Sequence, residues 1–315
     1  MTYNDKSPRV AAWLVLPLLL LVSVSALAQE RKTFPYVQRD STLYLDVWSP
    51  AQPRPDKACV VALFGGGFVI GARDDEYQTQ VAKVLTDRGF TVVSPDYRLG
   101  LKDSAMVARY SSLKGMRTLF QWCIDIATED CAAVVAYVTA HAAELNINPE
   151  RIVLTGCSAG AITVLQLDYC RANGLPQAEM LPAGWKPAAV VPYAGAVMCK
   201  GKPSYKTPPA PTMLMHGMKD KIVAYKRFPP VLRHALYGAA TVSKRMKKQG
   251  FPVWTVRFED VGHEVASWLP GSVDLFCAFV EQTFAGRISS LDATMTDSKL
   301  TPSKWTTMNV FDIYK

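Results

Sequence analysis

Residues 156–160 form a G-x-S-x-G pattern directly after the apolar run 151–155. A short buried strand that runs into this pattern is typical of a nucleophile elbow, in which a sharp turn holds the Oγ of Ser158 clear of the backbone. The flanking glycines allow the neighbouring chain to pass close to that turn. The apolar segment 161–169 then predicts a buried helix whose positive N-terminal end points at the serine. Small residues also occur in ordinary turns, so a catalytic role for Ser158 depends on partners elsewhere in the chain.

A second chemical feature is a run of three glycines, residues 65–67, after the apolar strand pattern 58–63. Successive glycines let backbone N–H groups turn toward one point, which is what an oxyanion hole requires. The run could instead be a flexible turn, and a dinucleotide-binding loop is excluded because its glycines leave one residue too many for G-x-G-x-x-G. We expect the oxyanion donors to be the N–H groups of Gly66, Gly67 and Ala159.

An acid and a base follow further along the chain, each just after a predicted strand. Residues 211–215 form an apolar strand pattern that leads to Asp220, and residues 252–258 alternate like a strand and lead to His263. The chain order is therefore Ser158, Asp220, His263, which is the order of the α/β-hydrolase triad.

Other candidates for the acid and the base fit less well. Glu259 and Asp260 lie on the same strand end as His263, three or four residues before it. Side chains so near to the histidine in sequence usually point away from it. The sequence has four histidines. Apart from His263, we expect His141 in a helix, His216 at the end of a strand and His234 before an amphipathic helix.

These motifs together resemble the α/β-hydrolase fold, and more narrowly its esterase branch with an H-G-G-G-type oxyanion loop. The resemblance covers roughly residues 43–284 and rests on residues 64–68, 94–99, Asp130, the serine elbow, residues 216–217 with Asp220, and residues 262–263. It implies a mostly parallel central sheet with helices on both faces and the triad at the carboxyl ends of the strands. One departure is Phe64, which stands where the family has the loop histidine. We expect this change to alter the rigidity of the loop and to leave the backbone donors in place.

The first residues are typical of a cleavable export signal. Lys6 and Arg9 precede an apolar run of about 15 residues, 10–24, which ends in the A-x-A sequence 26–28. The competing interpretation, a retained anchor, is disfavoured by Pro17 and by the short length of the run. We therefore predict a signal peptide at residues 1–28, export to the periplasm or the medium, and no stable membrane insertion after cleavage. Residues 29–315 are then expected to form a single domain.

Cysteines and charge narrow the possible classes of function. The seven cysteines of the chain leave at least one thiol unpaired, and bridges between Cys123 and Cys131 or between Cys170 and Cys199 are open possibilities. The spacing of cysteines and histidines predicts neither a metal site nor a cofactor. The net charge of +8 is explained by a solvated basic face or, less simply, by attraction to acidic polysaccharide. The sequence contains no nucleic-acid-binding motif.

The segments between the motifs predict the surroundings of the site. Residues 77–85 and 131–145 have helical patterns, and the polar insertion 99–122 is placed to roof the site. About 17 residues separate the strands at 188–193 and 211–215, which is too few for a large cap domain. The tail, residues 287–315, is expected to pack across the surface.

The sequence thus predicts a serine carboxylic-ester hydrolase. Two alternatives are a serine peptidase of the same fold and a non-catalytic binding protein of this fold. The expected substrates are small esters or acylated polysaccharides, with short acyl or hydroxycinnamoyl groups on a carbohydrate. Polar and aromatic side chains at the rim of an open cleft would hold the sugar, and the candidates are Arg109, Tyr110, Tyr205 and the lysines of residues 199–210. The sequence does not predict the oligomeric state.

Overall fold

The computed structural model describes residues 30–102, 113–229 and 234–313. The predicted signal peptide, residues 1–28, and the predicted rim residues Arg109 and Tyr110 lie outside the described residues. Within them, no helix is both long and apolar enough to span a membrane.

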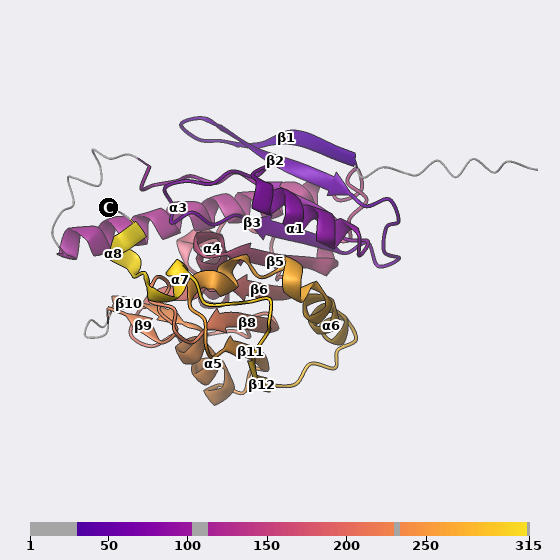
Figure 1. Cartoon of the computed structure of the whole chain (residues 1–315). Coiled ribbons are helices and arrows are strands. Elements are labelled where there is room, and N and C mark those ends of the chain that lie inside the picture. Colours follow the sequence, from indigo (N-terminus) through magenta and orange to yellow (C-terminus); the bar gives the residue numbers. More distant parts are fainter. Residues whose placement is uncertain (1–29, 103–112, 230–233, 314–315) are drawn as a thin grey trace, which may run out of the picture.

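The centre of the molecule is a nine-stranded sheet with the strand order β1-β2-β4-β3-β5-β6-β8-β11-β12 (Figure 1). The strands are β1 (Glu30–Gln38), β2 (Thr42–Ser49), β3 (Cys59–Leu63), β4 (Thr91–Pro95), β5 (Ile152–Cys157), β6 (Ala189–Tyr193), β8 (Thr212–Gly217), β11 (Val253–Phe258) and β12 (Leu291–Met295). β2 is antiparallel to both of its neighbours, and every other pair is parallel. The prediction of a mostly parallel sheet is confirmed.

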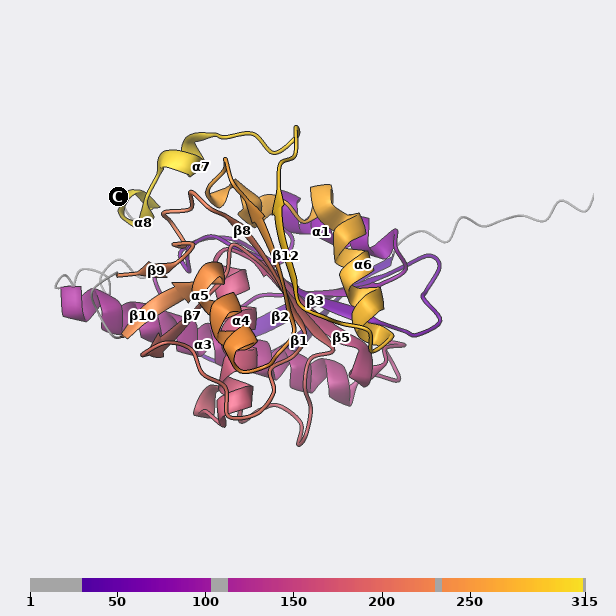
Figure 2. The same ribbon diagram turned by 90° about the horizontal axis from the view of Figure 1, so that it is seen from below.

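Helices cover both faces of this sheet, as predicted. They are α1 (Glu76–Thr86), α3 (Leu113–Ala140), α4 (Ala159–Asn173), α5 (Ala239–Lys248) and α6 (Val273–Phe284). Figure 2 shows α1 and α6 on one side of the sheet and α3, α4 and α5 on the other.

The central strands are apolar on both sides, which is the pattern that a parallel sheet covered by helices requires. Successive residues of β3 show this, because Val60 and Ala62 belong to the hydrophobic cluster under α1 and α6, whereas Val61 belongs to the cluster under α3 and α4. The carboxyl ends of these strands meet at one edge, where the candidate site lies.

Helix α3 differs from the prediction. The helix begins at Leu113 and ends at Ala140, so the helical pattern at residues 131–145 covers only its last ten residues and continues five residues past its end. His141, which was expected in a helix, lies just after it. The last part of the predicted insertion, residues 99–122, is therefore helical. Met116, Leu119 and Phe120 have the spacing of one helix face, and Leu119 is almost fully buried. The prediction of helix 77–85 is confirmed by α1.

A second, three-stranded sheet stands beside the carboxyl ends of the main sheet. Its strands are β7 (Ala196–Lys200), β10 (His234–Gly238) and β9 (Arg227–Phe228), in the order β7-β10-β9. The short segment between β6 and β8 thus holds a strand, in line with the prediction that no large cap is inserted there. His234, which was predicted to precede a helix, is the first residue of β10, and its Nε2 lies 2.8 Å from Oε1 of Gln121.

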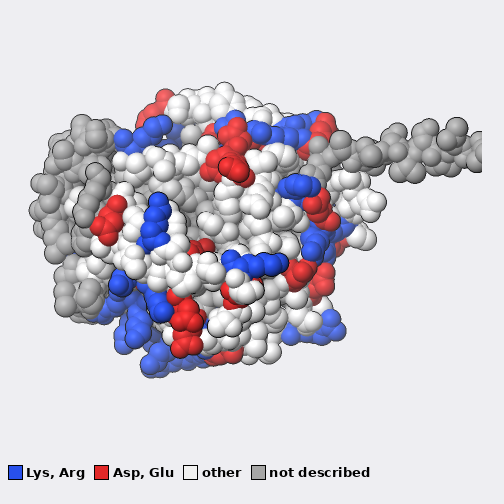
Figure 3. Space-filling model, in the orientation of Figure 1, with Lys and Arg blue, Asp and Glu red and all other residues white. Residues whose placement is uncertain are grey.

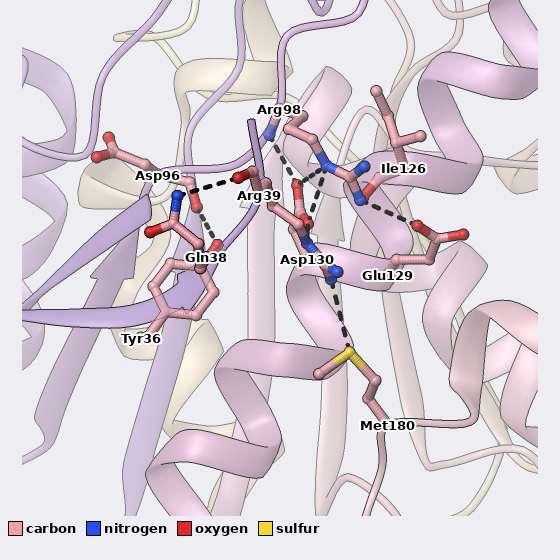
Figure 4. A network of polar contacts seen from close by, with 9 residues as sticks. All are labelled: Tyr36, Gln38, Arg39, Asp96, Arg98, Ile126, Glu129, Asp130 and Met180. Carbon is pink, nitrogen blue, oxygen red and sulfur yellow. Dashed lines mark hydrogen bonds and ion pairs between the residues drawn. The ribbon is translucent and has the colours of Figure 1, made fainter. Parts of the chain in front are cut away.

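A buried carboxylate ties α3 to the start of the described chain (Figure 4). The side chain of Asp130 is fully buried and accepts hydrogen bonds from Nε of Arg39 at 3.0 Å and from the backbone N and Nε of Arg98 at 2.9 and 2.8 Å. Arg98 also donates to Glu129 on the same helix at 2.9 Å. Since Arg39 follows β1 and Arg98 follows β4, this one side chain fixes α3 against two segments that are distant in sequence.

All seven cysteines of the chain are buried free thiols, so neither possible bridge forms. Cys123 and Cys131 are eight residues apart on α3, which separates them by about 12 Å at 1.5 Å per residue and exceeds the reach of a disulfide. Cys170 and Cys199 contact other groups: the thiol of Cys170 lies 3.7 Å from Oε1 of Gln177 and that of Cys199 lies 3.2 Å from the carbonyl oxygen of Gly201.

The positive charge is unevenly distributed. Figure 3 shows Lys and Arg gathered over β9, β10 and α5, whereas the middle of this face carries few charges. The last turn of α5 contributes Arg245, Lys247 and Lys248, where cations favour the helix dipole. Lys247 forms an ion pair with Asp292 on β12 and Arg245 donates to the carbonyl oxygen of Pro203, so part of this charge has a structural role.

Removal of the Asp130 carboxylate should destabilise the protein strongly. In Asp130→Ala, Arg39 loses its buried anion and Arg98 keeps only the pair with Glu129. Breaking a buried ion pair in this way costs about 3 kcal/mol or more. Urea unfolding followed by circular dichroism measures the loss. The control is Lys83→Ala, which removes the exposed pair with Asp87 and should cost less than about 1 kcal/mol. Equal losses in the two variants would contradict the role given to Asp130.

Candidate active site

Ser158 stands at a strained turn between β5 and α4. Its backbone has φ 51° and ψ −113°, a conformation that side chains rarely adopt and that costs about 1–3 kcal/mol. Both glycines of the motif are required because a Cβ at either position would collide with the backbone. At Gly156 the atom would lie 2.6 Å from the backbone of Gly160, and at Gly160 it would lie 2.3 Å from the carbonyl oxygen of Leu63. The sequence pattern therefore reflects a tight contact between the turn and the end of β3.

The structure brings together the three predicted side chains. Nε2 of His263 lies 2.8 Å from Oγ of Ser158, and Nδ1 of His263 lies 2.8 Å from Oδ2 of Asp220. Because an ionised carboxylate only accepts, Nδ1 carries the hydrogen, and Nε2 is left to accept from the serine hydroxyl. This arrangement can remove the hydroxyl proton of Ser158 as its oxygen attacks an electrophile.

The Asp220 carboxylate is held on both of its oxygens. Oδ1 accepts from the backbone N–H groups of Ile222 and Val223, both at 2.9 Å. Burial favours the neutral form, but electrostatic attraction to His263 and hydrogen bonds from His216 and His263 outweigh it, so the pKa of Asp220 lies well below its usual range. Asp220 is therefore ionised at neutral pH. The stability that it contributes is present above its unfolded pKa, about 3.9, and is lost as the pH falls through the lower folded pKa.

His216 is a neighbour of the acid that the sequence did not single out as functional. Its fully buried Nε2 lies 2.8 Å from the carbonyl oxygen of Val223 and 3.4 Å from Oδ2 of Asp220. Since both of these neighbours only accept, Nε2 carries the hydrogen. His216 lies at the end of β8, four residues before Asp220, so it orients the loop that carries the acid.

The glycine loop lies directly beside Ser158. A Cβ added at Gly65 would lie 3.3 Å from Cβ of Ser158, and Gly66 and Gly67 have φ values of +108° and +64°. Both conformations favour glycine over any residue with a side chain. Gly66, Gly67 and Ala159, the predicted oxyanion donors, line the same cavity as Ser158.

Phe64 braces the start of the glycine loop through its ring and its backbone. Its ring is buried and stacks on the ring of Tyr97, with centroids 4.3 Å apart. The hydroxyl of Tyr97 donates to the carbonyl oxygen of Phe64 at 2.7 Å. An aromatic stack and a hydrogen bond from a neighbouring loop thus hold this backbone.

The cavity in front of Ser158 has a volume of about 1000 Å³ and mostly apolar walls. One wall comes from the glycine loop and the first turns of α3, including Phe68, Ile70 and Phe120. The opposite side comes from the small sheet, including Phe228 and Leu236. Among the described residues, the charged side chains of the lining are Arg117 and Glu264. No group of described residues has the composition and spacing to hold a metal ion.

Of the residues predicted for sugar binding, those that the structure describes, Tyr205 and the lysines of residues 199–210, do not line this cavity. Tyr205 is buried, and its ring packs edge-on against Tyr169 and Phe251, at 5.6 and 6.2 Å between centroids. The prediction that Tyr205 lies at the rim is therefore wrong, because the aromatic side chain is drawn into the core between α4 and α5. Lysines 200, 202 and 206 are absent from the cavity lining in the described structure.

Several lining residues could not be expected from sequence motifs. Trp305, Val310 and Ile313 belong to the tail that was predicted only to pack across the surface. Their one signal was the presence of large apolar side chains in an otherwise polar segment.

Comparisons with known proteins agree with this arrangement. Residues 22–171 match a family described as "Carboxylesterase family", a span that contains the glycine loop and Ser158 and ends before Asp220 and His263. The structure of esterase 2 of Thermogutta terrifontis with bound butyrate superposes with a TM-score of 0.56 at 19% identity, covering 82% of this chain and 95% of the other. The chain has the α/β-hydrolase fold.

Curated relatives match over shorter segments. Lipase 2 of a Moraxella strain is 32% identical over 105 residues, which is 33% of this chain and 20% of the lipase. Acetyl esterase of Salmonella typhi is 33% identical over 129 residues, which is 40% of this chain and 33% of the esterase. Acetylcholinesterase of Electrophorus electricus is 31% identical over 137 residues, which is 40% of this chain and 18% of that protein. The matches thus span a third or less of the length of these relatives.

A side chain at Gly66 should disable the site more than it weakens binding. Its Cβ would lie 2.0 Å from the carbonyl oxygen of Ile70, so Gly66→Val must displace the loop and the N–H groups near Ser158. Loss of one oxyanion donor lowers kcat by about 100-fold or more, and we expect a much smaller change in KM. Steady-state kinetics on a p-nitrophenyl ester measures both constants.

The matched control for this variant is Gly174→Ala. Gly174 also has a positive φ, +64°, but an added Cβ there meets no atom within 4 Å. Its kcat should stay near the wild-type value. A normal kcat in a folded Gly66→Val protein would remove the glycine loop from the mechanism.

Proposed function

We propose that the protein is a serine carboxylic-ester hydrolase that uses Ser158, His263 and Asp220. The observation that carries this proposal is the pair of 2.8 Å contacts that link the serine hydroxyl, the imidazole and the buried carboxylate at the wall of one cavity. The carboxylesterase match and the esterase neighbours support the same class of reaction.

The acylation step follows from this geometry. Oγ of Ser158 attacks the ester carbonyl carbon while Nε2 of His263 takes the hydroxyl proton, and Asp220 stabilises the imidazolium that forms. Gly66, Gly67 and Ala159 supply N–H groups to the oxyanion, and the positive end of α4 favours its charge. Collapse of the tetrahedral intermediate transfers the proton from His263 to the leaving alcohol.

Deacylation uses the same groups in reverse order. His263 takes a proton from a water molecule, whose oxygen attacks the acyl-enzyme carbonyl, and the carboxylic acid leaves as Ser158 regains its proton. In acylation and in deacylation alike, the imidazole of His263 takes up one proton and then gives it back. The reaction therefore requires no redox change in the protein.

The walls of the cavity favour an apolar acyl group. Burial of each methylene contributes about 0.8 kcal/mol, and the cavity offers Phe68, Phe120 and Leu236 near Ser158. Short alkanoyl and hydroxycinnamoyl groups both suit such walls. A carbohydrate as the alcohol is the proposal that came from the sequence, and a direct assay of sugar esters must decide it.

Substitution of the three proposed catalytic residues should abolish ester hydrolysis without unfolding the protein. We expect Ser158→Ala to lower kcat roughly 10⁴-fold or more, since such residues act as a unit. His263→Ala should cost about as much and Asp220→Asn somewhat less. The assay is hydrolysis of p-nitrophenyl butyrate, with circular dichroism to confirm folding.

The control is His141→Ala, because His141 contacts Tyr137 and lies outside the cavity lining. Ser158→Ala with more than a tenth of the wild-type activity would contradict the assignment of the nucleophile. Cleavage of a peptide anilide by the wild type in the absence of ester hydrolysis would favour the peptidase alternative. No reaction with either substrate would favour a binding protein.

The acyl preference should follow the apolar walls of the cavity. We expect kcat/KM for p-nitrophenyl butyrate to exceed that for the acetate severalfold, given the contribution of two further methylenes, and we expect hydrolysis of methyl ferulate. Acetylated xylan tests the carbohydrate part of the proposal. p-Nitrophenyl palmitate tests a long acyl chain in the same assay. A clear preference for this palmitate ester, with no product from either methyl ferulate or acetylated xylan, would overturn this choice of substrate.

A further inference from the structure

The tail of the described chain returns to the active site. After β12, the chain crosses the carboxyl ends of the strands and forms α7 (Lys304–Thr307) and α8 (Val310–Ile313) (Figures 1 and 2). Trp305, Val310 and Ile313 line the same cavity as Ser158 and His263. We call residues 303–313 the C-terminal wall.

Glu264, the residue after His263, attaches this wall to the catalytic loop. Its Oε1 accepts three hydrogen bonds, from the backbone N and Oγ of Ser303 and from Oγ1 of Thr306, each at 2.7 Å. Its Oε2 accepts from the backbone N of Gly262, also at 2.7 Å. Burial alone would raise the pKa of Glu264, but the hydrogen bonds from Thr306 and Ser303 lower it. Four donors thus hold one ionised carboxylate.

Two further contacts fit the wall to the loops that carry the acid and the base. A Cβ added at Gly262 would lie 2.8 Å from Cα of Thr306, so the backbones pass as closely as a glycine allows. Lys221, next to Asp220, forms an isolated parallel bridge with Asn309. The wall therefore contacts both the loop of Asp220 and the loop of His263.

Trp305 is placed to contact a bound ester. The centroid of its ring lies 6.5 Å from that of His263, and the residue is still 37% exposed. A large apolar side chain that lines a cavity and stays this exposed can bury further surface only against a ligand or a moving segment. Val310 and Ile313, also in the wall, add further apolar side chains to the lining of the cavity.

We propose that the C-terminal wall is a substrate-binding element. In this wall, Trp305 is a specificity-determining residue that contacts the apolar chain of the acyl group. Glu264 is the positioning residue that holds the wall against the loop of His263. This inference rests on the proposed esterase function. An acetyl group is too short to reach far from Ser158, so the wall acts on longer groups.

The test compares p-nitrophenyl hexanoate with p-nitrophenyl acetate in the full chain. We expect Trp305→Ala to lower the ratio of kcat/KM for hexanoate over acetate by roughly ten-fold, the usual scale for a lost apolar contact in a specificity pocket. Glu264→Ala, which removes all four hydrogen bonds, should lower this ratio by a similar factor. It should also make the chain more sensitive to trypsin at Lys304.

The matched control is Trp122→Ala, because Trp122 is 40% exposed and lies outside the cavity lining. Its ratio should equal that of the wild type. A Trp305→Ala ratio that is unchanged, or that rises because the wall excludes long groups, would overturn the proposal and leave the esterase function standing. A Glu264→Ala variant that loses both activities equally would also overturn it, because the contact would then serve only His263. No hydrolysis of either ester by the wild type would remove both proposals.

Discussion

The contact on which the site depends is the close approach of the β5–α4 turn to the end of β3. Gly160 lies so near the carbonyl oxygen of Leu63 that a Cβ would stand 2.3 Å from it, and the next residues along the chain from Leu63 are Phe64 and the glycine loop. The turn that strains Ser158 therefore also fixes the loop opposite it. Because the two are in backbone contact, the distance between Ser158 and the N–H groups proposed as oxyanion donors is set by main-chain geometry and does not depend on long side chains.

The side walls of the cavity come from elements outside the main sheet. The first turns of α3, the small sheet β7-β10-β9 and the C-terminal wall each contribute apolar side chains such as Phe120, Leu236 and Trp305. In a hydrolase with an inserted cap, one segment would perform this task. Here three elements share it. Asp130 attaches α3, Glu264 attaches the C-terminal wall, and Gln166 of α4 accepts a hydrogen bond from the backbone N of Met198 in the small sheet. Their sequences can therefore change separately while the centre of the site stays in place.

The sequence predicted what depends on local backbone chemistry. The strand before Ser158, the glycines, and the strand ends that precede Asp220 and His263 are each recognised from patterns within about ten residues. The burial of Tyr205 and the position of Trp305 could not be predicted in this way, because each is decided by contacts with segments far along the chain. Helix α3 is an intermediate case. Its C-terminal part is strongly apolar and has a recognisable helical pattern. Its N-terminal part was assigned to the polar insertion 99–122 because of the polar residues beside it.

The polarity of the cavity bears on how these parts act together. In an apolar enclosure, the attraction between a developing oxyanion and fixed N–H groups is stronger than in water. The same enclosure would penalise an isolated charge, so the imidazolium of His263 depends on Asp220, whose two oxygens are already held by Ile222, Val223 and the imidazole itself. These donors are supplied before any substrate binds. The carboxylate thus needs no rearrangement when His263 becomes charged, and the low polarity of the walls can strengthen the oxyanion contacts without destabilising the base.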